Sequence, residues 1–331
     1  MIITMEYNEN IFKSTFKKDI TNYLNEKGLL KQGTKTLFYT LRQFDDYCYN
    51  QNIENNILTK DLVLKWLEKR PNEEFNNQSK RASMIRCFGT FLYRYNKENY
   101  IVPKMLFPIR EKYIPHIYTN DEIKRFFNIV DNLSPKVIND NKPIIMPIIY
   151  RILLFTGMRI NEVLSLKIKD FKIEGKSILV RNAKNHKDRL LPISDDLFNK
   201  LMDYNNSYNN GLNEESYLFR NNHNNRITND RFYKYFRLYL LKAKIPHAGK
   251  GPRVHDFRHT MTVNCIHNWL QNNKDVKALL PYLQNYLGHD NIESTYYYYH
   301  LTLSIYPYLE NKIIEVSNDI IPSINEDDIN E

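Results

Sequence analysis

Helical spacing of hydrophobic residues dominates the first hundred positions of the chain. In 34–49 the apolar side chains recur every three or four residues, and a shorter stretch after Thr59, a residue type that often begins helices, does the same. The segment 77–97 carries a further stripe. We therefore expect a small helical bundle whose core is formed by the stripe residues. These residues are Leu37, Leu41, Phe44, Cys48, Val63, Trp66, Leu67, Met84, Phe88, Phe91 and Tyr95.

A stretch with several prolines interrupts this pattern. Pro103, Pro108 and Pro115 lie within thirteen residues, among charged side chains. Sequence of this kind favours an extended linker over a helix or a strand. The predicted parts of the chain are a helical domain at 1–102, a linker at 103–116 and a second domain at 117–331.

Helical and strand-like patterns both occur after the linker. Two strand-like segments, 177–181 and 189–193, flank a polar turn, and 166–173 is expected to add a third strand. Since tight turns join antiparallel strands, the predicted sheet is small and antiparallel. The predicted fold class is mainly α with a small antiparallel β-sheet (α+β). Helices are expected at 119–132 (beginning at Thr119 or Asn120), 143–156 (ending at Gly157), 194–206, 227–243, 255–270, 274–287 and 291–300, followed by an amphipathic segment at 302–316.

Length and composition support two globular domains. The chain has 331 residues, of which 42% are hydrophobic. No apolar run is long enough to span a bilayer, and the N-terminus has no charged segment followed by an apolar one. A cytoplasmic protein without membrane contact is therefore expected. The cysteines, Cys48, Cys87 and Cys265, fit no metal-binding spacing and are predicted to be reduced thiols.

The net charge of +9 is unevenly distributed. Residues 315–331 contain six acidic residues and no lysine or arginine, so the rest of the chain carries +15. A basic body of this kind suits a polyanionic partner, and nucleic acid is the usual one. Charge alone leaves a second interpretation open, in which the excess of lysine and arginine serves only solubility.

Two predicted helices, 77–97 and 227–243, carry basic residues beside their apolar stripes. Cationic side chains on one helix face can bind phosphates, and a helix with such a face fits the DNA major groove. We therefore predict contacts with double-stranded DNA, although a face exposed only to solvent remains open for 77–97. The residues concerned are Lys80, Arg81 and Arg86 in the first helix and Arg231, Lys234 and Arg237 in the second.

The second domain also contains residues suited to phosphate chemistry. Cleaving a phosphodiester with a side-chain oxygen passes through a five-coordinate phosphorus with extra negative charge, so cations must surround it. Many enzymes use metal ions held by carboxylates, but no carboxylate cluster of suitable spacing occurs in the sequence. Guanidinium groups can replace the metal, because they are permanently charged and donate two hydrogen bonds at once. We therefore expect no metal and no cofactor.

The candidate residues lie in five short motifs. Two arginines, a lysine and two histidines can surround one phosphate while a tyrosine attacks it. The motifs are Thr-Gly-Met-Arg-Ile-Asn-Glu with Arg159, Ala-Lys-Asn-His-Lys-Asp-Arg with Lys184, His-Asp-Phe-Arg-His with His255 and Arg258, Leu-Gly-His with His289, and Ser-Thr-Tyr-Tyr-Tyr-Tyr-His with Tyr298.

Helical spacing adds detail to two of these motifs. Arg159 follows a glycine and begins a helix, and Glu162 lies on the same face three residues later. Glu162 is therefore predicted to orient the guanidinium, with a surface ion pair as the alternative. His255 and Arg258 are also three residues apart and share a helix face. His259, one residue further, is expected to point elsewhere and to be structural.

The order Arg, Lys, His-x-x-Arg, Leu-Gly-His, Tyr and the intervals between its members resemble the tyrosine recombinase (phage integrase) family. The resemblance is strong over 116–305 and is limited to general helical character over 10–100. It implies an enzyme of a phage, mobile element or chromosome-resolution system that cuts and rejoins DNA without metal or ATP. The reaction implied is attack by the tyrosine to form a 3′-phosphotyrosine.

The resemblance gives the lysine a role as general acid. Lys184 would protonate the leaving 5′ oxygen, and Lys187 in the same turn is the alternative. The family usually has Gly-Lys-Gly here, whereas this chain has Ala183 and Asn185 on either side of Lys184.

The resemblance also assigns the last two members of the set. His289 would hydrogen-bond a non-bridging phosphate oxygen and assist with the tyrosine proton. The family places its nucleophile nine residues after that histidine, which is Tyr298 in this chain. Tyr297 and Tyr299 remain alternatives.

On the scale of the molecule, the resemblance implies a core-binding (SAM-like) DNA-binding domain at 1–102 and a catalytic domain at 117–331, forming a clamp around duplex DNA. Four protomers would assemble on two DNA sites, and 302–316 would dock either on a neighbouring protomer or in cis. Two other functions stay open: a type IB topoisomerase, and a catalytically silent DNA-binding regulator on the same fold. The intact set of candidate residues argues against the regulator.

Overall fold

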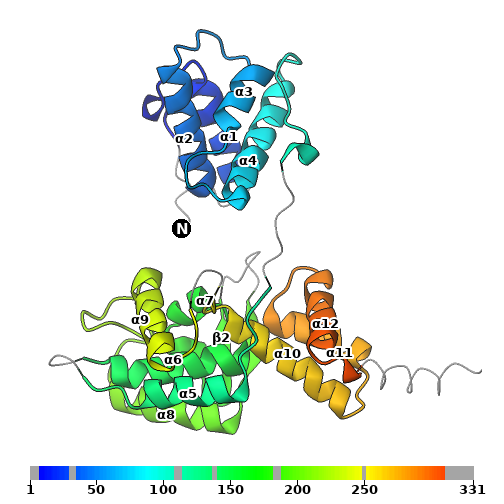
Figure 1. Cartoon of the computed structure of the whole chain (residues 1–331). Coiled ribbons are helices and arrows are strands. Elements are labelled where there is room, and N and C mark those ends of the chain that lie inside the picture. The colour runs from blue at the N-terminus through cyan, green and yellow to red at the C-terminus, as the bar shows by residue number, and fades with distance from the viewer. Residues whose placement is uncertain are drawn as a thin grey trace, which may run out of the picture. The chain divides into compact units, whose positions relative to one another are not determined.

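The computed structural model describes residues 7–29, 35–107, 114–135, 140–181, 188–247 and 251–309 (Figure 1). The chain divides into two compact units, Met1–Tyr113 and Ile114–Glu331. Each unit has a hydrophobic core of its own. The predicted fold class is confirmed, because helices dominate the described residues and the strands among them form a small antiparallel sheet.

Helices form the described part of the first unit. They are α1 (Lys17–Leu29), α2 (Lys35–Asn50), α3 (Lys60–Leu67) and α4 (Phe75–Tyr93), with the short 3-10 helices η1 (Glu9–Ile11) and η2 (Lys104–Leu106) at either end. Thr59 begins α3 as predicted, because its hydroxyl accepts a hydrogen bond from the Leu62 N–H at 3.3 Å. The helices meet around Phe16, Phe44 and Phe88, whose rings contact one another.

Most of the predicted core stripe is buried in this bundle, but Tyr95 is not. Because α4 ends at Tyr93, Tyr95 lies in the turn that follows, and its ring is 76% exposed. Leu37 and Met84 are only partly buried. The predicted apolar stripe therefore extends two residues beyond the observed end of α4.

The prediction that Arg81 contacts DNA is wrong. Position 81 lies four residues before Ile85 and seven before Phe88, so it is on the core face of α4. The buried guanidinium pairs with both carboxylate oxygens of Glu73 at 2.7 Å and donates to the Trp66 carbonyl at 2.6 Å. Arg81 therefore ties α4 to the carboxyl end of α3, where a cation is favourable.

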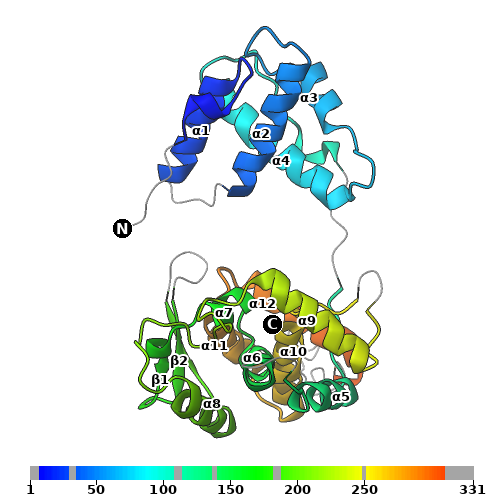
Figure 2. The ribbon, with the colours of Figure 1, turned by 90° about the vertical axis from the view of Figure 1, so that its left-hand side faces the viewer.

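A long apolar helix, α6 (Lys142–Thr156), is the centre of the second unit. It packs against α5 (Asn120–Asp131), α8 (Asp195–Tyr208) and α10 (Asp256–Gln271), and α9 (Asn229–Lys242) packs on α5 (Figure 2). Buried residues occur on nearly every face of α6, as expected for a helix covered on all sides. Thr119 begins α5 through a reciprocal cap with Glu122, and Gly157 ends α6 with a φ of 63°.

The antiparallel sheet has the order β1-β2-β3, with β1 (Phe171–Lys172), β2 (Ser177–Val180) and β3 (Arg189–Pro192). Ile178 pairs with both Phe171 and Leu191, and all three side chains are buried.

The strand predicted at 166–173 is mostly wrong. The 3-10 helix η3 (Ile168–Asp170) occupies its middle, because the Asp170 carboxylate accepts a hydrogen bond from the Lys167 N–H at 3.0 Å and turns the backbone, and only Phe171–Lys172 is a strand.

Helices α10, α11 (Val276–Leu287) and α12 (Glu293–Ile305) share a second core in this unit. Since α12 continues to Ile305, the separate segment predicted from residue 302 is wrong for its first turn. Its remainder from residue 310, with the acidic stretch 315–331, lies outside the described residues. Across the described part of the chain, no helix combines the length and the apolar character needed to cross a membrane.

Candidate active site

Arg159 lies at the start of the short helix α7 (Ile160–Leu164), directly after the turn that ends α6. Its backbone N–H donates to one carboxylate oxygen of Glu162 at 3.0 Å, and its guanidinium donates to the other, also at 3.0 Å. The side chain of Arg159 is 28% exposed, so a ligand can reach it. This geometry suits the predicted orienting of Arg159 by Glu162.

Arg258 lies deeper, on α10, and is only 1% exposed. Its two terminal nitrogens donate to the Gly157 and Leu287 carbonyls, both at 2.8 Å. Burial, followed by the charge of Arg159, lowers the pKa of Arg258 to about 10, so the guanidinium stays charged at neutral pH. Arg258 therefore joins the turn after α6 to the end of α11.

The carbonyls on either side of Leu287 bind two further arginines. The Tyr286 carbonyl accepts a hydrogen bond from Arg189 at 3.0 Å, and the Gly288 carbonyl accepts one from Arg159 at 3.2 Å. The last carbonyls of a helix lack partners within the helix and carry partial negative charge, so they attract cations. The end of α11 thus collects three guanidinium groups from distant parts of the chain.

Arg189, which sequence reasoning did not single out, also pairs with Glu162. The distances between its terminal nitrogens and the two carboxylate oxygens are 2.7 and 3.1 Å. Burial alone would raise the pKa of Glu162. The hydrogen bonds and charges of Arg189 and Arg159 outweigh that effect and hold the pKa below its ordinary value. Glu162 is therefore an anion that serves two arginines at once.

His289 follows the end of α11, and its ring is held against the ring of Tyr298. The Nδ1 atom is 2.9 Å from the Thr295 hydroxyl, and the two rings are parallel to within 3° with centroids 5.8 Å apart. Burial and the charges of Arg258 and Arg159 lower the pKa of His289 to about 3. The imidazole is therefore neutral at pH 7.

His255 stands at the start of α10, where the residue is exposed at the edge of the site. Desolvation and the charges of Arg258 and Arg159 hold its pKa below the ordinary value. As an imidazole beside Arg258, it is neutral at pH 7 and reachable by a ligand. His255 is the N-cap residue of α10, and Arg258 lies in the first turn of that helix.

The prediction that His259 points elsewhere is wrong. Its ring centroid lies 5.3 Å from that of Tyr298 and 4.8 Å from that of His255. The sequence contained the signal, because His259 is four residues after His255 and so lies on the same helix face. Its Nδ1 atom is buried and finds no hydrogen-bond partner in the described part of the protein.

The four consecutive tyrosines of α12 have different surroundings. Tyr298 is 4% exposed and lies on the buried face with Thr295 and Thr302, whereas Tyr296 and Tyr297 are 37% and 38% exposed. Burial raises the pKa of Tyr298, and the positive charge of Arg258 offsets part of that rise. The phenol is therefore protonated at neutral pH.

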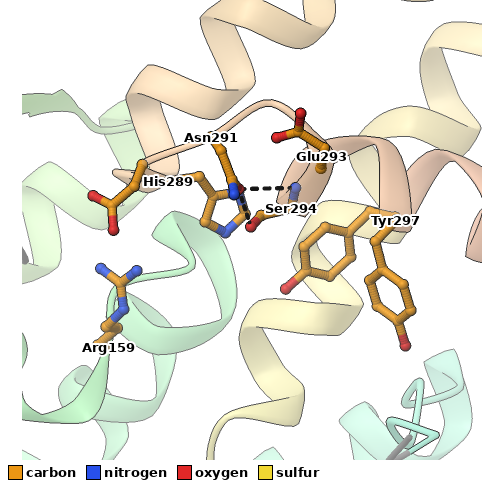
Figure 3. Close-up of a pocket in the computed structure, with 8 residues that line it drawn as sticks. Arg159, His289, Asn291, Glu293, Ser294 and Tyr297 are labelled. Atoms are coloured by element: carbon orange, nitrogen blue, oxygen red, sulfur yellow. Dashed lines mark hydrogen bonds between the residues drawn. The ribbon is translucent and has the colours of Figure 1, made fainter. Parts of the chain in front are cut away.

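An open hollow of about 520 Å³ lies in front of these residues. Figure 3 shows Arg159 on one side of it and His289 and Tyr297 on the other. Tyr298 also lines it, so a phosphate placed here would meet an arginine, a histidine and the candidate nucleophile together. The rest of the lining is polar and consists of Asp290, Asn291, Glu293 and Ser294.

Lys184 and its alternative Lys187 lie outside the described residues. Among those that are described, no cluster of three or more histidine, cysteine, aspartate or glutamate side chains could hold a metal ion.

The predicted DNA-contacting residues differ in their surroundings. Lys80 on α4 and the basic residues of α9 are exposed, while the aromatic residues Phe232 and Phe236 of α9 are buried in the core. Arg86 is partly buried and donates to the Val102 carbonyl at 2.7 Å, so it ties down the chain after α4. The exposed basic residues of α9 are Arg231, Lys234 and Arg237.

Comparisons with known proteins agree on one family. The phage integrase family model matches residues 117–304, more than half of the chain. The tyrosine recombinase XerD of Oceanobacillus iheyensis is 26% identical over 295 residues, covering 87% of each chain. The tyrosine recombinase XerA of Pyrococcus horikoshii is 24% identical over 298 residues, covering 90% of this chain and 93% of its own.

Solved structures show the same fold. XerH site-specific recombinase bound to palindromic difH substrate matches with a TM-score of 0.62 and 17% identity, over 90% of this chain and 89% of XerH. The Tn1549 transposon integrase in complex with circular intermediate DNA matches with a TM-score of 0.59 and 19% identity, over 86% of this chain and 95% of the integrase. The chain therefore belongs to the phage integrase family, the tyrosine recombinases that break and rejoin DNA.

Proposed function

We propose that this tyrosine recombinase cleaves and rejoins double-stranded DNA at specific sites, with Tyr298 as the nucleophile. The observation that carries the proposal is the meeting of three side chains at one hollow. Arg159, His289 and Tyr298 line it, and the positive charge of the buried Arg258 acts on the Tyr298 phenol.

The two arginines would bind the phosphate to be cut. Arg159 is partly exposed and Arg258 is buried, so one reaches the phosphate from the open side and the other from the interior. Both are already fixed by carbonyl and carboxylate oxygens, which supports a preorganised site for the extra negative charge of the transition state. Removing one such donor typically lowers the rate by roughly 10²–10³-fold.

The attack would exchange one phosphate ester for another. The Tyr298 oxygen forms a bond to phosphorus while the bond to the 5′ oxygen breaks, leaving the 3′ phosphate on the tyrosine. The phenol proton passes to a neutral imidazole, for which His289 and His255 are the candidates, and the 5′ oxygen takes a proton from Lys184. Because an ester bond is kept, attack by a 5′ hydroxyl rejoins the strand without ATP.

The DNA partner is supported by relatives and by surface charge. XerH was solved with difH substrate and the Tn1549 integrase with circular intermediate DNA. We propose that Lys80 of the first unit and the exposed basic face of α9 contact the duplex here, and that four protomers assemble on two DNA sites. The separate first unit would serve as the core-binding domain and the second as the catalytic domain.

A suicide substrate tests the proposal. A duplex carrying the recombination site, nicked just beyond the scissile phosphate, loses a short 5′ fragment after cleavage, so the covalent adduct accumulates. We expect a protein–DNA adduct on site-containing duplex in the presence of EDTA. Relaxation of plasmids that lack any site would favour a type IB topoisomerase instead, and site-specific binding without adduct would favour a silent regulator.

A further inference from the structure

Arg189 makes more contacts at the site than a surface arginine would. It begins β3, and its side chain is 10% exposed. Its Nε donates to the Tyr286 carbonyl at 3.0 Å, while its terminal nitrogens donate to the two oxygens of Glu162 at 3.1 and 2.7 Å. One planar group thus fastens the sheet, the helix end and the orienting carboxylate together.

Gly288 leaves room for this guanidinium. Its φ of 68° is one that side-chain-bearing residues rarely adopt, and a Cβ atom there would lie 3.0 Å from Nη1 of Arg189 and 3.2 Å from Cζ. The Leu-Gly-His motif therefore has a packing requirement beside its backbone requirement. The glycine lets Arg189 lie against the end of α11, directly before His289.

The charges around Glu162 make Arg189 important for Arg159. The Glu162 side chain is 9% exposed and accepts hydrogen bonds from both arginines. With Arg189 present, one negative charge is shared between two guanidinium groups, and Arg159 keeps much of its positive charge available for a phosphate. Without Arg189, the poorly solvated carboxylate would rely on Arg159 alone and would compete with the phosphate for it.

We propose that Arg189 is a positioning residue for DNA cleavage, one that holds Glu162 and the end of α11 so that Arg159 and Arg258 face the scissile phosphate. The proposal rests on the proposed recombinase function. Arg189 touches neither the phosphate nor the nucleophile in this scheme, so its removal should slow the chemical step more than it weakens DNA binding.

The test measures single-turnover adduct formation on the nicked duplex at saturating protein, together with DNA affinity and the melting temperature. Arg189→Met is expected to form the adduct at least about tenfold more slowly than the wild type, with affinity within about threefold. Arg189→Lys keeps a charge but cannot bridge both Glu162 oxygens and the Tyr286 carbonyl, so its rate should also fall. If Arg189→Met does not fold, the cleavage rate of Arg189→Lys tests the proposal instead.

Arg151 offers a matched control. It pairs with both oxygens of Asp131 at 2.7 and 2.8 Å and donates to the Pro147 carbonyl at 3.2 Å, away from the site. Arg151→Met should lower the melting temperature about as much as Arg189→Met while leaving the cleavage rate within about twofold. Equal slowing by the two variants, or no slowing by either Arg189 variant, would overturn the proposal.

A double-mutant cycle tests the route through Glu162. If Arg189 acts by holding that carboxylate, adding Arg189→Met to Glu162→Gln should slow cleavage by less than about threefold, because the shared interaction is already lost. Fully multiplicative effects would contradict this route. A wild type that forms no adduct would instead count against the proposed function, which keeps the two failures distinct.

Discussion

The proposed nucleophile is distinguished from its neighbours by burial. Tyr298 shares the buried face of α12 with Thr295 and Thr302, and its ring is parallel to that of His289. The sequence contained part of this information, because 295, 298 and 302 follow helical spacing. It could not contain the effect of the Arg258 charge on Tyr298, because the two residues lie on different helices.

Two other residues of the site show where sequence reasoning reached its limit. His259 could have been found, since its distance of four residues from His255 places both on one helix face. Arg189 could not, because its pairing with Glu162 joins residues 27 apart and depends on how β3 docks on α11. The spacing of apolar residues describes one helix or strand at a time, so contacts between elements cannot be predicted from it.

The stability of the second unit should depend on pH through His259. Burial, with the charges of His255 and Arg258, lowers its pKa from 6.5 to about 3. The unfolded state therefore binds a proton more readily, and stability is lost as the pH falls from about 6.5 toward 3. Between pH 7 and pH 5, His259→Gln should lose roughly 1–2 kcal/mol less unfolding free energy than the wild type, as measured by urea denaturation.

The control for this prediction is His223→Gln, since His223 is exposed in a loop. That variant should follow the wild-type pH dependence. If the His259→Gln and wild-type curves run parallel, the buried imidazole does not titrate as described.

Long periodic helices and the paired strands β2 and β3 could be predicted from sequence, and the other short elements only in part. The stripes at α2 and α6 gave helices close to the observed bounds, since three or more turns repeat the pattern. The five-residue helix α7 is too short to show a period, and its start at Arg159 is fixed by Glu162 instead. At 166–173, a hydrogen bond from the Lys167 N–H to the Asp170 side chain stabilises a turn in place of the predicted strand. The alternation of apolar residues gives no sign of such a bond.

The turn between α6 and α7 should tolerate no side chain at Gly157. Its φ of 63° is strained for other residues, and a Cβ atom would lie 3.0 Å from Leu287 and 3.3 Å from Met261. Gly157→Ala should therefore lower the unfolding free energy by roughly 1–3 kcal/mol, measured by urea denaturation. Gly175→Ala is the matched control, because only the Ser177 hydroxyl lies within 4 Å and the cost should be smaller.

At the scale of the molecule, the division near residue 113 follows from composition. The prolines from Pro103 to Pro115 separate two stretches that each contain enough apolar residues for a core, and the two units have separate cores. Individual charges were harder to assign from sequence. Arg81 and Arg231 look alike in a list of basic residues, yet one is buried against Glu73 and the other is exposed.

DNA binding should weaken strongly with salt, as expected for a chain with 47 basic and 38 acidic residues. Arg231→Gln and Lys234→Gln should each reduce the slope of log affinity against log salt concentration by about one, measured by fluorescence anisotropy with duplex DNA. Lys176→Gln should leave the slope unchanged. That lysine lies directly before β2 and pairs with Asp195, the first residue of α8. Equal slopes for all variants and the wild type would show that α9 does not contact DNA.

The most direct measurement is the identity of the tyrosine that becomes linked to DNA. On the nicked duplex, Tyr298→Phe should form no covalent adduct while its DNA affinity stays within about threefold of the wild type, since only a hydroxyl is lost. Tyr297→Phe, altered one residue away in the same hollow, should still form the adduct, and mass spectrometry of the digested wild-type adduct should find the nucleotide on Tyr298. Adduct formation by Tyr298→Phe, or a nucleotide on another residue, would contradict the account.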